Sequence, residues 1–190
     1  MKTQIALATA AEIPRLQAVE RRAAALFGTH PQTAALHLPD TPAEWFTRAQ
    51  RAGLLWAARV GDEPAGFALV EDFGTSLHLE ELDVAPEYGR QGIGRRLVRA
   101  VAEAAARRGL PVTMCTFTEV PWNAPAYERM GFVRLQDAEL SQAHRARRRE
   151  EAERGLSPGI RVAMRLDPGT ANGRHDESGR AGECCGVQGE

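Results

Sequence analysis

The chain has 190 residues, 43% of them hydrophobic and 26% charged, and a formal net charge of −1. These values are typical of one soluble globular domain, and a near-zero charge excludes bulk attraction to nucleic acid. Three cysteines, including the adjacent Cys184 and Cys185, exclude a disulfide framework and a four-cysteine zinc site, so no metal is expected. The chain has no apolar run of membrane-spanning length and no signal-peptide pattern at its start, which predicts a cytoplasmic protein without membrane association.

Two helix-start signals organise the first part of the chain. Thr9 and Glu12 have the spacing of a capping box, which predicts a helix from that point. Thr41 and Glu44 repeat the spacing with a proline between them, and a short helix is expected from there to Gly53. The strands expected in this part are residues 5–8, 54–60 and 65–73.

Strands and helices alternate along the second part. In chain order we expect a strand at 77–84, a helix at 97–109, a strand at 112–117, a short helix at 123–131, a strand at 132–136, a charged helix at 138–154 and a strand at 160–166. This order predicts an α/β fold in which a mixed sheet of about seven strands is flanked by helices, antiparallel first and parallel around the central helix. The domain is expected to span residues 1–167, and the glycine-rich polar residues 168–190 form a disordered tail.

The strand at residues 77–84 changes its hydrophobic phase midway. Leu77 and Leu79 fall on odd positions, whereas Leu82 and Val84 fall on even ones. Because side chains of a strand alternate with a period of two, one inserted residue is needed, which predicts a β-bulge at residues 80–81. A strand covered on both faces is the alternative interpretation. A bulge frees backbone groups beyond it to pair with an extended ligand.

A glycine-rich turn, GRQGIGRRL at residues 89–97, joins this strand to the central helix. Backbone N–H groups at such a turn converge at the positive end of a helix dipole, which favours a phosphate group. The spacing is neither that of a P-loop nor that of a dinucleotide fingerprint. Together with the bulge, the turn predicts an extended ligand that carries amides and ends in a pyrophosphate, which describes coenzyme A.

The blocks LDVAPEYGRQGIGRRL and NAPAYERMGF make the chain resemble the GCN5-related N-acetyltransferase superfamily over about residues 3–167. The segment around the second block and the last strand is also similar to a bacterial subgroup of the superfamily. The resemblance implies acetyl-CoA as cofactor, held at the pantetheine, pyrophosphate and amide positions of the family. The implied cofactor-binding residues are Leu82, Asp83, Val84, Arg90, Gln91, Gly92, Ile93, Gly94, Arg95 and Asn123. The family motif usually opens with Gln or Arg where this chain has Gly89, and Arg90 then substitutes for it.

Acetyl transfer to an amine needs a base that removes a proton from the amine. The candidates are Glu80, Glu81, His78 and Glu119. Glu80 is expected at the bulge, where its alternative role is a solvated or salt-bridged strand residue. His78 has an ordinary pKa nearer neutrality, but a packed core histidine is the alternative. Glu119 could instead bind a cationic acceptor.

The resemblance implies that Tyr127 protonates the departing thiolate, whereas a core tyrosine packed on the sheet is the other interpretation. Cys115 lies within an apolar strand, which favours a core residue over a nucleophile. We therefore expect direct transfer without an acetylated cysteine. The expected catalytic residues are Tyr127, Glu80 and His78.

Acidic and aromatic side chains are expected to surround the acceptor, with the loop at residues 28–40. The carboxylates Glu71, Asp72, Glu80 and Glu119 predict a cationic acceptor, either a small amine or a peptide N-terminus. The residues expected to contact the acceptor are Trp45, Glu119 and Trp122.

Two other functions fit parts of the pattern. One is a catalytically silent acyl-CoA-binding sensor or interaction module, and the other is a nucleotide-binding protein that uses the same turn. The basic run at residues 145–149 is followed by Glu150, Glu151 and Glu153, so it is expected to be a solvated helix face rather than a nucleic-acid site. A homodimer is compatible with the sequence.

Overall fold

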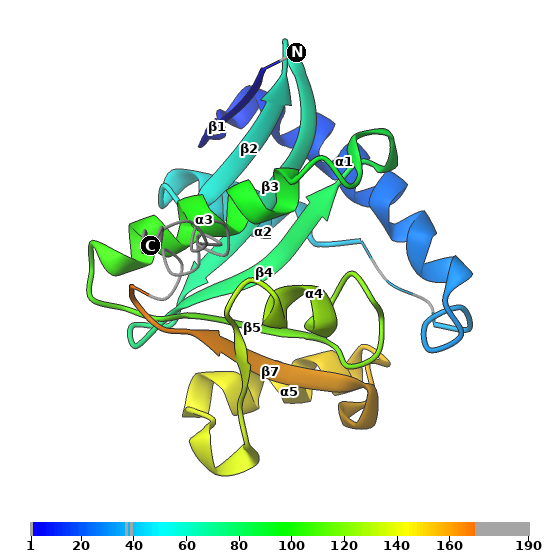
Figure 1. Cartoon of the computed structure of the whole chain (residues 1–190), viewed down its shortest axis with the longest axis vertical. Helices are drawn as coiled ribbons and strands as arrows, with labels where there is room; N and C mark the ends of the chain where they lie inside the picture. The colour runs from blue at the N-terminus through cyan, green and yellow to red at the C-terminus, as the bar shows by residue number, and fades with distance from the viewer. Residues whose placement is uncertain (1, 37, 39, 170–190) are drawn as a thin grey trace, which may run out of the picture.

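The computed structural model describes residues 2–36, 38 and 40–169 (Figure 1). Within them, one mixed sheet has the strand order β1-β2-β3-β4-β5-β7-β6, with β4 and β5 parallel and every other neighbouring pair antiparallel. The strands are β1 (Thr3–Leu7), β2 (Leu55–Val60), β3 (Glu63–Asp72), β4 (Leu77–Val84), β5 (Val112–Phe117), β6 (Val133–Arg134) and β7 (Arg161–Leu166). The predicted fold class is confirmed.

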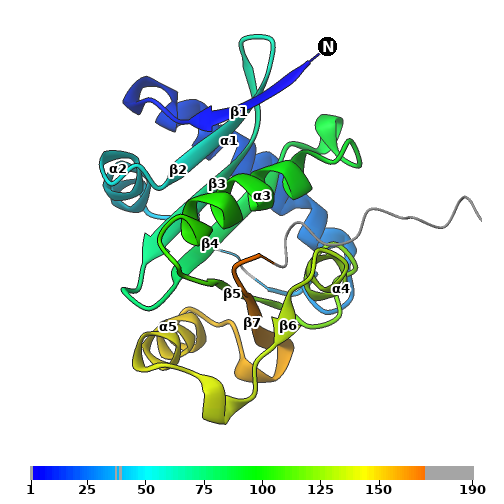
Figure 2. The same ribbon diagram turned by 60° about the vertical axis from the view of Figure 1, so that its left-hand side comes forward.

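Helices cover both faces of this sheet (Figure 2). The α-helices are α1 (Ile13–Ala24), α2 (Ala43–Arg51), α3 (Ile93–Ala106), α4 (Ala124–Glu128) and α5 (Gln142–Glu153). One face packs against α3 and α4, because Leu97 and Val101 of α3 and Tyr127 of α4 share a hydrophobic cluster with Leu77 and Leu79 of β4. The other face packs against α1 and α2.

A bulge interrupts β4 at the predicted place. Leu69 of β3 lies opposite Glu81 and Val70 lies opposite Leu79, so Glu80 is the extra residue in the ladder. The phase slip in the sequence is therefore confirmed as a β-bulge. As a result, Leu79 and Leu82 both pack toward α3.

The strands β4 and β5 separate at the bulge. Their parallel pairing covers only Leu77 to Leu79 of β4 and Val112 to Met114 of β5. Beyond that point β5 continues beside β7, while β4 continues beside β3, and Figure 1 shows the two strands diverging. Residues 80–84 of β4 therefore have no strand partner on the β5 side.

The structure corrects several predicted boundaries, including that of the central helix, which is Ile93–Ala106 rather than 97–109. Thr41 does not form the second capping box: α2 begins at Ala43 with Pro42 at its N-cap and no side-chain cap. The strand expected at 132–136 is only Val133–Arg134, and the charged helix is Gln142–Glu153 after a 3-10 turn at Asp137–Glu139. The predicted box of Thr9 and Glu12 is present.

Among the described residues, no helix has both the length and the apolar character needed to cross a bilayer. The predicted tail falls almost wholly on residues 170–190, which lie outside the described part of the chain, as do Cys184 and Cys185.

Candidate functional site

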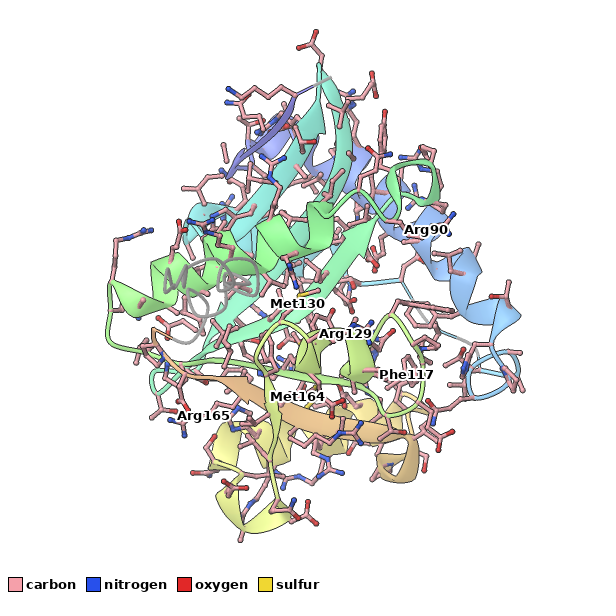
Figure 3. The ribbon with its side chains drawn as sticks, in the orientation of Figure 1. Arg90, Phe117, Arg129, Met130, Met164 and Arg165 are labelled. Carbon is pink, nitrogen blue, oxygen red and sulfur yellow. The ribbon has the colours of Figure 1, made fainter. Side chains whose placement is uncertain are left out.

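A cavity of about 130 Å³ opens where β4 and β5 diverge. Its floor consists of Leu79 to Asp83 of β4 and Met114 to Phe117 of β5. The walls come from α1, α2, α4, α5 and β7. In Figure 3, Phe117 marks the end of β5 and Arg90 marks the loop between β4 and α3. The bulge and the end of the β4–β5 pairing thus open the sheet at one place.

The glycine-rich turn presents free backbone donors next to the end of β4. Arg90 and Gly92 both adopt left-handed backbone conformations, with φ of 58° and 74°. The helix α3 starts at Ile93 without a side-chain cap, and the first N–H near its start that donates within the chain is that of Arg96, to Gly92 O. Within the described residues, no backbone hydrogen bond uses the N–H groups of residues 90–95. These groups lie at the positive end of the helix dipole, an arrangement that favours an anion.

The side chains near this turn have separate roles. Ile93 is buried, so only its backbone is available to a ligand. Leu82 and Val84 pack against the α3 cluster, and Gly94 lies over them: a Cβ built there would be 3.8 Å from Val84 Cγ2. The backbone of β4 therefore faces the gap while its apolar side chains anchor the strand.

Gly66 of β3 explains how β4 is held at the end of the sheet. A Cβ at this position would lie 2.6 Å from the carbonyl oxygen of Asp83. Only glycine permits so close an approach of the two backbones. The position of residues 83 and 84 beside the turn thus depends on a residue outside the site.

Asn123 and Tyr127 line the cavity, and Asn123 carries an unsatisfied polar atom. The Asn123 side chain donates from Nδ2 to Thr116 Oγ1 at 2.7 Å, while its Oδ1 is buried without a hydrogen-bond partner. Tyr127 packs its ring against Phe132, with 5.7 Å between the ring centroids. Burial raises the pKa of the Tyr127 hydroxyl, so this group stays protonated. Both residues line the cavity.

Glu80 belongs to a buried ion-pair network. Arg147 of α5 places Nη2 2.9 Å from Glu80 Oε1 and also pairs with Glu71. The Arg147 guanidinium lies over the Trp45 ring, 4.6 Å from its centroid, and Trp45 lines the cavity. Burial raises the pKa of Glu80 well above its usual range, and the charge of Arg147 opposes that shift. The ion pair with Arg147 therefore fixes the position of the Glu80 carboxylate.

Glu81 and Asp83 also line the cavity, and within the described ranges of the chain no salt bridge involves either of them. Burial raises the pKa of Glu81 to about 7, and the negative charge of Glu20 adds to the shift. Burial also raises the pKa of Asp83 well above its ordinary value, and Glu81 contributes to that shift. A carboxylate with a pKa near neutrality is suited to accept a proton at physiological pH.

The family model for the acetyltransferase (GNAT) family matches residues 17–132. This match covers more than half of the chain and contains both the bulged strand and the turn. The chain belongs to the GNAT family. The predicted resemblance and enzyme class are thereby confirmed.

Relatives of known activity match part of the chain. Thialysine N-epsilon-acetyltransferase of Caenorhabditis elegans is 31% identical over 90 residues, 43% of this chain and 55% of that protein. Streptothricin acetyltransferase of Streptomyces lavendulae is 42% identical over 74 residues, 36% of this chain and 38% of that protein. The chain thus spans about half or less of the length of these relatives.

Solved structures share the fold at low identity. Ribosomal-protein-S18-alanine N-acetyltransferase from Escherichia coli has a TM-score of 0.61 at 18% identity, with 95% of this chain and all of that chain (100%) covered. N-acetylglutamate synthase from Neisseria gonorrhoeae, complexed with coenzyme A and N-acetyl-glutamate, has a TM-score of 0.67 at 16% identity, with 88% of this chain and 35% of that one covered.

Acetyl-CoA, the predicted cofactor, is the co-substrate of this GNAT family. The free N–H groups of the turn and the unpaired edge of β4 fit an extended pyrophosphate ligand.

Other predicted residues lie around this GNAT site rather than in it. His78 does not line the cavity: its Nδ1 is 3.0 Å from Thr113 Oγ1 and its ring stacks on Phe73, with 4.4 Å between the ring centroids. Burial lowers the pKa of His78 well below its ordinary value, so the ring is neutral. Glu119 and Trp122 are exposed and are absent from the cavity wall, although Trp122 packs against the cavity residue Phe27.

The structure brings in charged residues that sequence reasoning missed. These cavity residues are Glu20 of α1, Arg147 and Glu151 of α5, Arg154 directly after α5, and Arg161 of β7. Glu20 had a detectable signal, because it lies within the buried stripe of α1 that includes Leu16, Val19 and Ala23. The others come from the distant end of the chain. Asp72, expected at this mouth, instead pairs with Arg108 at 2.6 Å.

Proposed function

We propose that this protein transfers the acetyl group of acetyl-CoA directly to a primary amine of a cationic acceptor, either a small amine or a peptide N-terminus. The observation that carries the proposal is Glu81, a cavity carboxylate with a pKa of about 7 beside the unpaired edge of β4. Acetyl-CoA supplies the acetyl group as an activated thioester.

The cofactor would be held by three sets of groups. The free N–H groups of residues 90–95 suit the pyrophosphate, with Arg90, Gln91 and Arg95 as exposed side chains around it. The edge of β4 at residues 82–84 suits the pantetheine amides, because it has no strand partner there. The buried Oδ1 of Asn123 is a further acceptor that a ligand N–H could satisfy.

The chemistry needs the nitrogen to lose two protons and the departing sulfur to gain one. An alkylammonium has a pKa of about 10.4 and cannot attack a carbonyl until it loses a proton. In the proposal Glu81 accepts that proton, and the nitrogen forms its bond to the acetyl carbon. Backbone N–H groups on the free edge of β4 donate to the developing oxyanion. As the carbon–sulfur bond breaks, the protonated hydroxyl of Tyr127 donates to the sulfur, and the second proton that the nitrogen loses on becoming an amide returns to the Tyr127 oxygen.

The charge of the cavity favours a cationic acceptor. Its lining includes six carboxylate residues and three arginines; the carboxylates are Glu20, Asp40, Glu80, Glu81, Asp83 and Glu151. Two of the arginines are already paired, Arg147 with Glu80 and Arg161 with Glu151. Because the pKa values of several of these carboxylates are raised, an arriving ammonium would favour their ionised forms and be held by them, whereas an anionic acceptor would gain no such attraction. The name of one GNAT relative, thialysine N-epsilon-acetyltransferase, refers to acetylation of an amine nitrogen as well.

Thiol release from acetyl-CoA, measured over a panel of amines, tests this function. We expect release with cationic amines and little with anionic amino acids. Preference for anionic amino acids would contradict the acceptor class. Binding of acetyl-CoA without release for any amine would instead favour the silent acyl-CoA-binding module.

A further inference from the structure

We infer that Glu20 forms a subsite for a second ammonium group, so that the preferred acceptors carry two amines, an inference that rests on the proposed function. One amine would react beside Glu81, while the other would bind the carboxylate of Glu20. The acceptor class is then a short diamine, or a larger molecule that ends in one.

Glu20 is a buried carboxylate with one unused oxygen. It is 7% exposed and lines the cavity. Its Oε1 accepts a hydrogen bond from the backbone N–H of Thr41 at 2.7 Å, whereas Oε2 is buried without a partner. Buried polar atoms are nearly always satisfied, so an orphaned carboxylate oxygen at a cavity calls for a donor from a ligand.

No cation within the described part of the chain pairs with Glu20. Two of the three cavity arginines form ion pairs elsewhere: Arg147 pairs with Glu71 and Glu80, and Arg161 pairs with Glu151, while Arg154 lies over the Trp45 ring. A lone buried carboxylate is costly, and an arriving ammonium would remove that cost.

Electrostatic coupling connects Glu20 to the reacting region. Burial raises the pKa of Glu20, and its charge in turn raises the pKa values of Glu81 and Asp83. The three carboxylates thus repel one another across one cavity. A dication would relieve this repulsion at two points, whereas a monoamine would relieve it at one.

The size of the cavity limits the spacer between the amines. Its volume is about 130 Å³. A cavity of about 150 Å³ holds benzene, which has six heavy atoms, so a diamine with a short alkyl chain is of matching size. Ala24, one helical turn after Glu20 on α1, and Phe27 supply apolar wall for that alkyl chain.

Titration of the full chain with putrescine and with n-butylamine, in the presence of coenzyme A, tests the subsite by calorimetry. The two amines have the same carbon chain and differ by one ammonium. We expect putrescine to bind about tenfold tighter or more, as a hydrogen bond between charged groups predicts. The variant Glu20→Gln keeps an oxygen for Thr41 and replaces the unused oxygen with an amide, so it should abolish that preference.

The matched control is Glu44→Gln, which removes one negative charge from an exposed position of α2. It should leave both affinities within about twofold. Equal affinity of the wild-type protein for the two amines, or a preference for putrescine that survives in Glu20→Gln, would overturn the subsite. Thiol release is measured in parallel: diamine-selective binding without release would contradict the proposed acetyl transfer and leave the subsite supported.

Discussion

Replacement of Glu81 by glutamine should remove the base from the reaction and change its pH dependence. The side chain keeps its size and one acceptor oxygen, so the cavity wall is preserved. A general base contributes about 10²- to 10⁴-fold to a rate, so we expect kcat/KM to fall by at least about a hundredfold. The wild-type profile follows from the pKa of about 7 that burial and Glu20 give this carboxylate.

Whether kcat/KM rises or falls with pH depends on which protonation form of Glu81 reacts. Only the ionised carboxylate accepts a proton, so kcat/KM should rise with pH up to about 7 and then level. Below that pH it should fall about tenfold per unit, because the ionised fraction falls by that factor. Thiol release at saturating acetyl-CoA, recorded from pH 5 to 9, measures the profile.

Glu80→Gln is the control, since Glu80 is the neighbouring carboxylate and is held by Arg147. It should retain the acidic limb of the profile, whereas Glu81→Gln should lose it. The assignment of the base would be refuted if Glu81→Gln kept the limb with less than about a threefold loss of kcat/KM.

Three further variants separate catalysis from structure. Tyr127→Phe should lower kcat about a hundredfold and leave the Kd of coenzyme A within about twofold, as measured by thiol release and calorimetry; an unchanged kcat would remove the hydroxyl from the chemistry. Cys115→Ala should keep kcat within about threefold, because burial raises the pKa of this thiol to about 12; loss of all activity would argue against direct transfer. Glu12→Gln should lower the free energy of unfolding by about 2 kcal/mol at neutral pH, because Glu12 forms a two-point pair with Arg59. The Arg59 guanidinium lowers the pKa of Glu12 to about 2, below its ordinary 4.5. The difference in free energy of unfolding between the variant and the wild type should therefore shrink as the pH falls from 4.5 toward 2. Urea unfolding at several pH values measures this difference, and a constant value would refute the prediction.

The bulge and the turn that we propose for the cofactor could be predicted from the sequence because their signals are local. The phase slip between Leu79 and Leu82 is confirmed as a bulge, and the glycine-rich turn follows it with Gly92 in a left-handed backbone conformation. Both features depend on residues a few positions apart, for which spacing is enough.

The acceptor side could not be predicted in the same way, because distant segments build it. Arg147 reaches Glu80 from the other end of the chain, and no local pattern marks that pairing. The same limit explains the failed capping box: the N–H of Thr41 is bound by Glu20 of α1, while Pro42 takes the N-cap position of α2. Tertiary contacts, rather than local spacing, decide these positions.

Following the path of the acetyl group is the most direct test of the proposed direct transfer. The protein is incubated with acetyl-CoA labelled in its acetyl group and with a cationic amine, and the label and the free thiol are followed together. Direct transfer predicts that the label appears on the amine nitrogen in equal amount to the thiol, with none on the protein. Label that accumulates on the protein, or thiol that appears without acetylated amine, would contradict it.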